Sequence, residues 1–197
     1  MDVKDAIIKR RSIRWYEKKK IAADIVTEIL DAARFAPSGC NAQPWRFIVV
    51  EDPKTVEALK QHDAFPQSFV YEAPAIFVCC GDPAAYAGKY GGENQIDEGT
   101  VPEDPEERKA MFSIVEGKNV ERAIRDVSIA SAFMVLRATE LGLGTSYIGL
   151  INEAALRTVL GIPASLIIPY VVIMGYTAQT PNKTPRKKLR EILIEPK

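Results

Sequence analysis

The stretch NVERAIRDVSIASAFMVLRATELGLG, residues 119–144, predicts the helix around which the rest of the chain folds. From Val127 to Leu136 nearly every side chain is apolar or small, so this part of the helix has no polar face. A helix of that kind is expected to be buried on all sides. Because a chain of 197 residues has few elements to surround it, the pattern favours a helix at the centre of an oligomer. The small residues at 130–132 would allow close helix approach.

Segments on either side of this helix alternate between strand and helix patterns. Strands are expected at 46–52, 74–82 and 166–176, and helices at 2–10, 21–39, 53–61 and from a cap at Asn152 to Leu160. The unbroken apolar run at 74–82 is typical of a strand buried on both faces. REILIEP, residues 190–196, reads as a short strand that could add to a partner's sheet. No repeat or linker is visible, so residues 1–197 are expected to form a single domain.

One irregular segment interrupts that domain. Residues 81–105 are rich in glycine, proline and acidic side chains. Irregular segments of this length inside compact domains usually cover a site or form a binding loop. We therefore interpret residues 84–107 as a lid-like insertion.

Composition excludes several classes of function. The 26 basic and 26 acidic residues cancel, so no overall field favours nucleic acid or an anionic membrane. No apolar run reaches the length of a membrane span. Three cysteines without a CxxC pair and a lone His62, expected on a helix surface, point away from disulfides, a metal site or a Ser-His-Asp triad. These features predict a cytoplasmic protein that binds neither nucleic acid, membrane nor metal.

Two basic clusters stand out in this neutral chain. KRRSIRWY, residues 9–16, follows the first predicted helix, and the partial negative charge of that helix end explains its first three cations but not Arg14. The second cluster comprises Lys183, Arg186, Lys187, Lys188 and Arg190. It is either a solvated tail or, together with the first cluster, one half of a site for a phosphate dianion.

A turn-rich loop, APSGCNAQPWRF at 36–47, lies between these clusters in the sequence. It offers polar donors, a glycine for close backbone approach and Trp45 as a flat face, although an ordinary connection with Trp45 in the core is the alternative. A flavin needs a cationic phosphate site and donors to its ring edge. Cys40 is interpreted as a small buried thiol. GLGTSYIG at 142–149 lacks the third glycine of a dinucleotide-binding turn.

In order and spacing, these segments resemble the FMN-dependent nitroreductase family: KRRSIRWY, AARFAPSGCNAQPWRF, APAIFVCC, ELGLGTSYIG and PRKKLREIL. The resemblance covers about residues 4–194, and the RRSxRxY and APSxxNxQPW elements together are specific. It implies an α+β fold, a three-layer α/β/α sandwich around a mainly antiparallel sheet. It also implies a homodimer with flavin sites at the interface and an exchanged C-terminal strand.

The resemblance further implies which residues bind FMN: Arg10, Arg11, Ser12, Arg14, Pro37, Ser38, Gly39, Asn41, Gln43, Gln67, Ile148, Gly149, Arg186 and Lys188. Arg10 and Ser12 would contact the phosphate or ribityl group, and the pair 186 and 188 would complete the phosphate site. Residues 37–39 would reach the flavin of the other subunit. The sequence departs from the family at two places, since many members carry an acid at position 148 and an asparagine near position 67.

The activity implied is hydride transfer from NAD(P)H to flavin N5, followed by reduction of a nitroaromatic, quinone or activated alkene in a ping-pong mechanism. No protein group would act as a catalytic residue, although Arg14 would stabilise the anionic reduced ring. Flavin-destroying or reductive dehalogenating enzymes of the same fold remain alternatives, as does a non-catalytic flavin-binding protein. An RNA-binding surface is disfavoured by the zero net charge.

Overall fold

The structure, a computed structural model, describes residues 1–86, 104–113, 115–194 and 196. Its centre is a four-stranded antiparallel sheet in the order β1-β2-β4-β3. The strands are β1 (Trp45–Val50), β2 (Ala75–Gly81), β3 (Leu143–Ile148) and β4 (Ile167–Tyr176). The helices are α1 (Val3–Lys9), α2 (Ala23–Arg34), α3 (Pro53–Gln61), α4 (Pro105–Ser113), α5 (Asn119–Glu140) and α6 (Glu153–Leu160).

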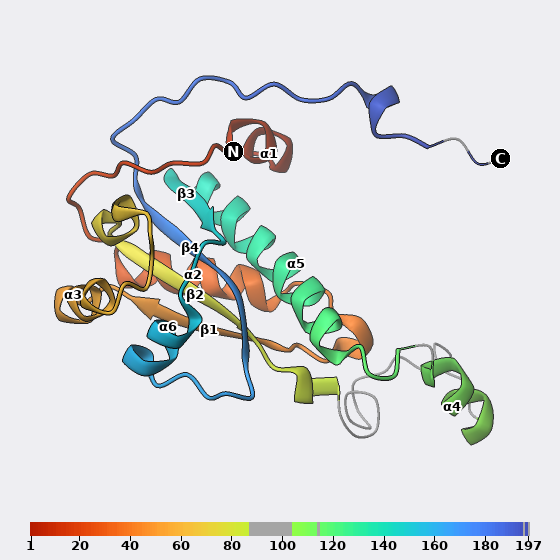
Figure 1. Ribbon diagram of the computed structural model, residues 1–197. Helices are drawn as coiled ribbons and strands as arrows, with labels where there is room; N and C mark the ends of the chain where they lie inside the picture. Colours follow the sequence, from red (N-terminus) through yellow and green to blue (C-terminus); the bar gives the residue numbers. More distant parts are fainter. Residues whose placement is uncertain (87–103, 114, 195, 197) are drawn as a thin grey trace.

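Helices cover both faces of this sheet, which confirms the three-layer α+β expectation (Figure 1). Side chains of β2 alternate between the two sides: Phe77 packs in the core with α2 and α5, whereas Val78 packs in the core with α3 and α6. All of β2 is buried, as its apolar run predicted. The cap predicted for α6 is present, since Asn152 accepts a backbone hydrogen bond, and Asp52 caps α3 in the same way.

The strand β3 was not predicted, because residues 142–149 were compared only with a dinucleotide-binding turn, whose third glycine they lack. Gly142 adopts a left-handed backbone, with φ of 82°, which lets the chain reverse directly from α5 into the sheet. Leu143 then pairs with Tyr176 and Ile148 with Val171. A short strand with glycine and two hydroxyl residues carries little β signal of its own, so its pairing with β4 decides its structure.

The expectation for the long helix needs correction. Ala130 and Ser131 are fully buried against the sheet, but Ile129 and Phe133 are 38% and 40% exposed. Within one chain the helix is therefore covered on one side only. The apolar residues of the other side face outward and are available for contact with another chain.

The predicted strand at 190–196 is also wrong for the single chain. Leu189–Glu191 forms a 3-10 turn, and neither 192–194 nor 196 belongs to a strand. Figure 1 shows why, since the chain beyond β4 passes over α1 and leaves the body, where it has no strand to pair with. Exchange of this segment in a dimer stays a prediction.

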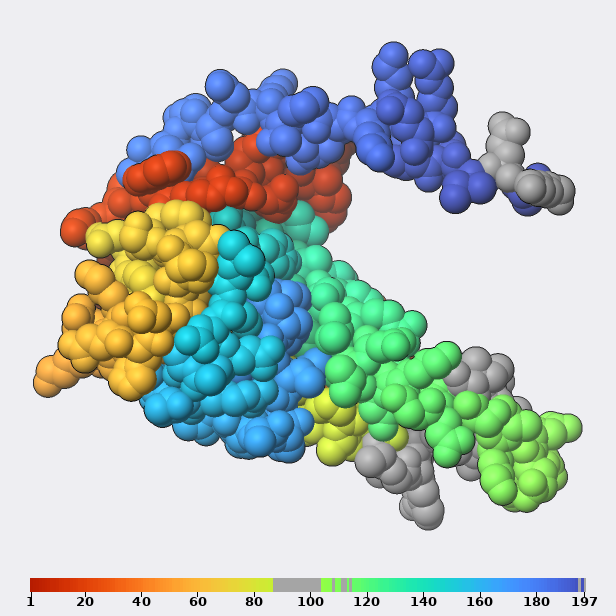
Figure 2. Space-filling model, viewed as in Figure 1, coloured from red at the N-terminus to blue at the C-terminus, as the bar shows by residue number. Residues whose placement is uncertain are grey.

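The predicted insertion at 84–107 lies largely outside the described residues. The 3-10 turn Pro83–Tyr86 precedes the undescribed part, and α4 begins at Pro105, within the last residues of the predicted irregular range. Figure 2 shows α4 and the C-terminal segment projecting from the molecule at separate places.

Candidate functional site

The segment after α1 runs along the edge of the sheet. Ser12 forms a parallel bridge with Thr145 of β3, and the Ile13 N–H donates to the Thr145 carbonyl at 2.9 Å. Gly144 makes this approach possible, because a Cβ there would lie 2.6 Å from the Ile13 side chain. The basic segment is therefore fixed to β3 by its backbone, which leaves its cationic side chains to other partners.

We expect Gly144→Ala to destabilise the protein by about 1–3 kcal/mol, the usual cost of overpacking a filled site. The added methyl group must displace Ile13, so the FMN binding that the family resemblance implies for the neighbouring basic segment should weaken as well. Urea unfolding and flavin titration measure the two effects. Ile13→Ala in the same chain makes room and should recover part of both losses; strictly additive losses would contradict this account.

The structure divides the first basic cluster into two kinds of side chain. Lys9 pairs with Asp5 at 3.5 Å, and Arg11 Nη1 donates to the Ile8 and Arg10 carbonyls at 2.6 and 2.7 Å. The helix-end explanation therefore holds for Lys9 and Arg11. The guanidinium groups of Arg10 and Arg14 have no carboxylate partner among the described residues, which leaves them free to bind an external anion.

Two residues that sequence reasoning missed hold Arg14 in place. Gln179 Oε1 accepts hydrogen bonds from the backbone N–H groups of Arg14 and Trp15, both at 2.9 Å. Phe69 lies beneath the guanidinium, with 5.9 Å between Arg14 Cζ and the ring centroid. Neither residue carries a signal in the sequence, because each is brought to Arg14 from a distant segment.

Three buried side-chain oxygen atoms lack hydrogen-bond partners within the described part of the chain: Glu51 Oε1, Gln67 Oε1 and Thr145 Oγ1. Two of them are linked to the basic segment, because Gln67 comes two residues before Phe69 and Thr145 forms the bridge with Ser12. Such atoms are uncommon in folded proteins and usually have a partner outside the chain. Together with the two unpaired guanidinium groups, they fit a ligand that has an anionic end and hydrogen-bonding groups on a ring, as FMN does.

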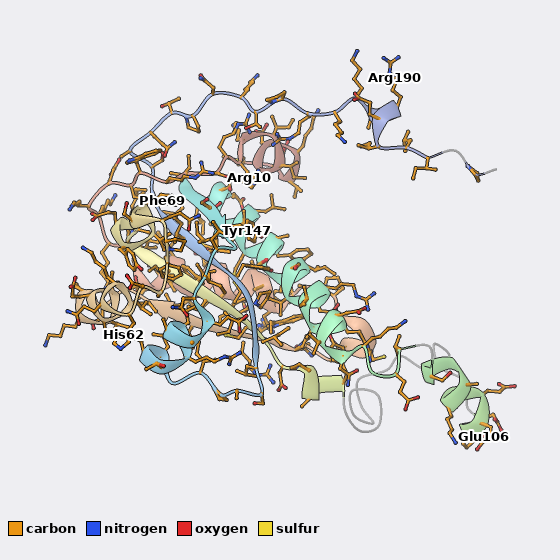
Figure 3. All side chains as sticks on the ribbon, in the orientation of Figure 1. Arg10, His62, Phe69, Glu106, Tyr147 and Arg190 are labelled. Carbon is orange, nitrogen blue, oxygen red and sulfur yellow. The ribbon has the colours of Figure 1, made fainter. Side chains whose placement is uncertain are left out.

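At the end of β3 the two predicted residues behave differently. The Ile148 side chain is buried in the core shared with α3 and α6, so its backbone alone is available to a ligand. Gly149 is exposed, with open space where a side chain would stand. Figure 3 shows Arg10 and Tyr147 near this end of the sheet. Burial raises the pKa of Tyr147, while its hydrogen bond to Ser131 and the nearby Arg10 charge act in the opposite direction.

The loop at 37–43 carries unusual backbone strain. Cys40, Asn41 and Gln43 all have positive φ, between 46° and 54°. Non-glycine residues in that region cost about 1–3 kcal/mol each and cluster at functional sites. The Ser38 hydroxyl accepts from the Gln43 N–H at 2.9 Å inside the loop. Trp45 is only 8% exposed and packs in the core, so it cannot offer the flat face that was considered.

Two side chains of helix α5 contact this loop. Asp126 Oδ2 accepts from the Gly39 N–H at 2.9 Å, and Arg122 Nη2 lies 3.8 Å from Cys40 Sγ. Cys40 is half-buried, rather than buried as expected, and its basic neighbour comes from 82 residues away. In the sequence, Arg122 and Asp126 look like ordinary charges near a helix start, so nothing there indicates this contact.

The structure does not bring all predicted site residues together within one chain. The loop contacts α5 at Asp126, whereas Ser12 is bridged to Thr145 of β3. The strand β3 runs back along α5, so that the Tyr147 hydroxyl lies 3.1 Å from Ser131 Oγ. Arg186 contacts only the neighbouring Thr184 and Pro185 carbonyls on the C-terminal segment. The predicted site is thus divided into three parts: loop, basic segment and C-terminal segment.

The residues that the structure describes contain no group of three histidine, cysteine or acidic side chains arranged to hold a metal ion. No helix within the described ranges is long and apolar enough to cross a bilayer.

The fold and site together define an α+β sandwich with a basic segment at the edge of its sheet. The model of the Nitroreductase family matches residues 7–176, and the chain belongs to that family. An NADH dehydrogenase from Thermus thermophilus is 32% identical over 203 residues, covering 98% of this chain and 96% of the relative. A shorter match, 46% identical over 50 residues, is to an iodotyrosine deiodinase from Thermotoga neapolitana and covers 25% of this chain and 27% of that protein.

Solved structures agree on the fold. A nitroreductase family protein from Clostridium difficile superposes with a TM-score of 0.75 at 28% identity, over 98% of both chains. An NADPH:FMN oxidoreductase from Vibrio harveyi, solved with NAD⁺, gives a TM-score of 0.75 at 21% identity, over 98% of this chain and 76% of that one. This second likeness concerns the fold alone.

Proposed function

We propose that this protein is an FMN-dependent oxidoreductase that takes electrons from NAD(P)H and reduces a nitroaromatic, quinone or activated alkene. The observation that carries the proposal is the pair of unpaired guanidinium groups, Arg10 and Arg14, fixed to the sheet edge in a member of the nitroreductase family. The names of the relatives from Thermus thermophilus and Vibrio harveyi support a nicotinamide donor.

FMN would supply the redox chemistry of a ping-pong exchange between the nicotinamide and the acceptor. The chain's own groups would bind and orient it. Arg10 and Ser12 would hold the phosphate, and Arg14 would place a positive charge near the ring. The orphaned Gln67 Oε1 would accept a hydrogen bond from the ring edge, and the backbone at Gly149 would line the site.

A homodimer would complete the site. The exposed side of α5 carries Ile129 and Phe133, and next to it lies an apolar groove of about 370 Å³ between α1, α2 and α5. Large exposed apolar areas of this kind mark interfaces. If two copies of α5 cross about a twofold axis, the loop of one chain can approach the basic segment of the other.

The test is to identify the released cofactor by mass and to measure NADH and NADPH oxidation with menadione or a nitroarene as acceptor. We expect Arg10→Ala to weaken FMN binding about tenfold or more, since a charge-assisted contact contributes about 1.5–3 kcal/mol. Arg11→Ala is the matched control, with a smaller effect, because that guanidinium already bonds two carbonyls of its own chain. Equal losses of FMN affinity in both variants would contradict the distinction between an available Arg10 and an already bonded Arg11.

Reductive dehalogenation is the second candidate, favoured by the match to iodotyrosine deiodinase over 50 residues. Release of iodide from an iodotyrosine, exceeding the rate with a nitroarene or quinone, would establish it. A flavin-loaded protein that turns over none of these acceptors would instead be a non-catalytic flavin-binding protein.

A further inference from the structure

We propose that Asp126 is a positioning residue, whose buried carboxylate holds the loop Ser38–Gln43 in the conformation that serves the flavin. The claim that Asp126 holds the loop rests on contacts within this chain. The claim that the loop serves the flavin rests on the proposed function. The hydrogen bonds of Asp126 go to the loop and to Tyr86, so it acts through the loop and not as a catalytic residue.

The hydrogen bonds of Asp126 connect three segments that are distant in the sequence. Its Oδ2 accepts from the Gly39 N–H at 2.9 Å and from the Tyr86 hydroxyl at 2.6 Å. Asp126 and Tyr86 are 8% and 5% exposed, so both bonds are shielded from water. A buried carboxylate is costly unless it is well paired, and here the backbone of the loop supplies one of its two donors.

Arg122, one helical turn earlier, completes this cluster. Its guanidinium lies 4.0 Å from the centroid of the Tyr86 ring and within 3.8 Å of Cys40 Sγ. It contributes positive charge beside the Asp126 carboxylate, on the same face of α5. The loop therefore contacts a charged cluster. These contacts explain how one short loop can keep three residues with positive φ.

The position of the loop gives this anchor its function. Ser38 and Gly39 are the residues expected to reach the partner's flavin, and Gly39 is the one that Asp126 holds directly. A loop with three strained residues would leave this conformation if its anchor were lost. FMN binding would then require the loop to be ordered again, at the expense of affinity.

Cys40 provides a direct measurement of the loop. It is half-buried, whereas Cys79 and Cys80 are fully buried in β2 and should stay unreactive while the protein is folded. In the purified full chain, we expect Asp126→Ala to raise the rate of Cys40 reaction with Ellman's reagent about tenfold, and to weaken FMN binding about tenfold by fluorescence titration. Asp126→Asn keeps an accepting oxygen and should stay within about threefold of wild type in both measurements.

Two further variants keep the test decisive. Gly39→Pro removes the same hydrogen bond from the side of the loop, without altering the buried carboxylate, and should also accelerate Cys40 labelling. Tyr86→Phe removes the other bond to Asp126 and should change labelling less than Asp126→Ala does. Reaction of all three cysteines would reveal that Asp126→Ala unfolds the protein. In that case the labelling rate of Gly39→Pro decides whether this hydrogen bond holds the loop.

Equal Cys40 rates in wild type and in the folded variants would overturn the proposal. An Asp126→Asn variant as reactive as Asp126→Ala would also overturn it, because a retained acceptor should retain the loop. Faster labelling with unchanged FMN affinity would overturn the part that concerns the flavin. If wild type itself binds no FMN, the proposed function fails, while the labelling rates still decide whether Asp126 positions the loop.

Discussion

Replacing Arg186 and Lys188 together by alanine is expected to weaken FMN binding about 100-fold or more and to leave the fold intact. Each charge-assisted contact to a phosphate contributes about 1.5–3 kcal/mol, and 1.4 kcal/mol corresponds to a factor of ten in affinity. Both residues lie on the exposed C-terminal segment, where Arg186 contacts only neighbouring carbonyls. Their removal should therefore cost the chain itself no stability.

Flavin fluorescence titration measures the affinity, and thermal unfolding of the cofactor-free protein measures the fold. Lys183→Ala with Lys187→Ala is the matched control, because it removes two charges from the same segment. If the phosphate site is built from specific residues, the control should lose much less FMN affinity. The salt dependence of FMN binding should become weaker only in the Arg186 and Lys188 variant. Unchanged FMN affinity in the Arg186 and Lys188 variant would refute the split phosphate site.

The substitution Phe133→Glu is expected to produce a folded monomer that no longer binds FMN. The side chain is 40% exposed in the single chain, so Glu there can stay hydrated until a second chain covers it. Burying that carboxylate in an apolar interface would cost several kcal/mol, enough to abolish a micromolar dimer. FMN binding should fail at the same time, because the proposed site needs the loop of the partner chain beside the basic segment.

Sedimentation velocity and flavin fluorescence measure the two losses together. Thr158→Glu, exposed on α6 beyond the opposite face of the sheet, is the control and should remain a flavin-binding dimer. Ala130, which a sequence-based test would have chosen, is fully buried against the sheet, so Ala130→Glu would unfold the chain and report nothing about the interface. A wild-type protein that sediments as a monomer with bound flavin would disprove the dimeric site.

Much of the fold could be predicted from local patterns. The cap at Asn152 and the continuous apolar run of β2 depend on neighbours in the sequence, and they appear where they were expected. The order of motifs likewise identified the family, since RRSxRxY and APSxxNxQPW are contiguous segments. The strand β3 was missed because its stability comes from pairing with β4 and little from its own residues.

The sequence by itself thus determined the helices other than α4, the buried strand and the motifs that resemble a flavin-binding family, because each depends on residues a few positions apart. Tertiary structure alone decided which cations remain available, since Arg11 turns to carbonyls of α1 while Arg10 does not. It also decided that Phe133 faces outward and that Asp126 meets Gly39 from 87 residues away. The physical reason is that burial and pairing of charge depend on distances in space, which a linear pattern of residue types does not contain.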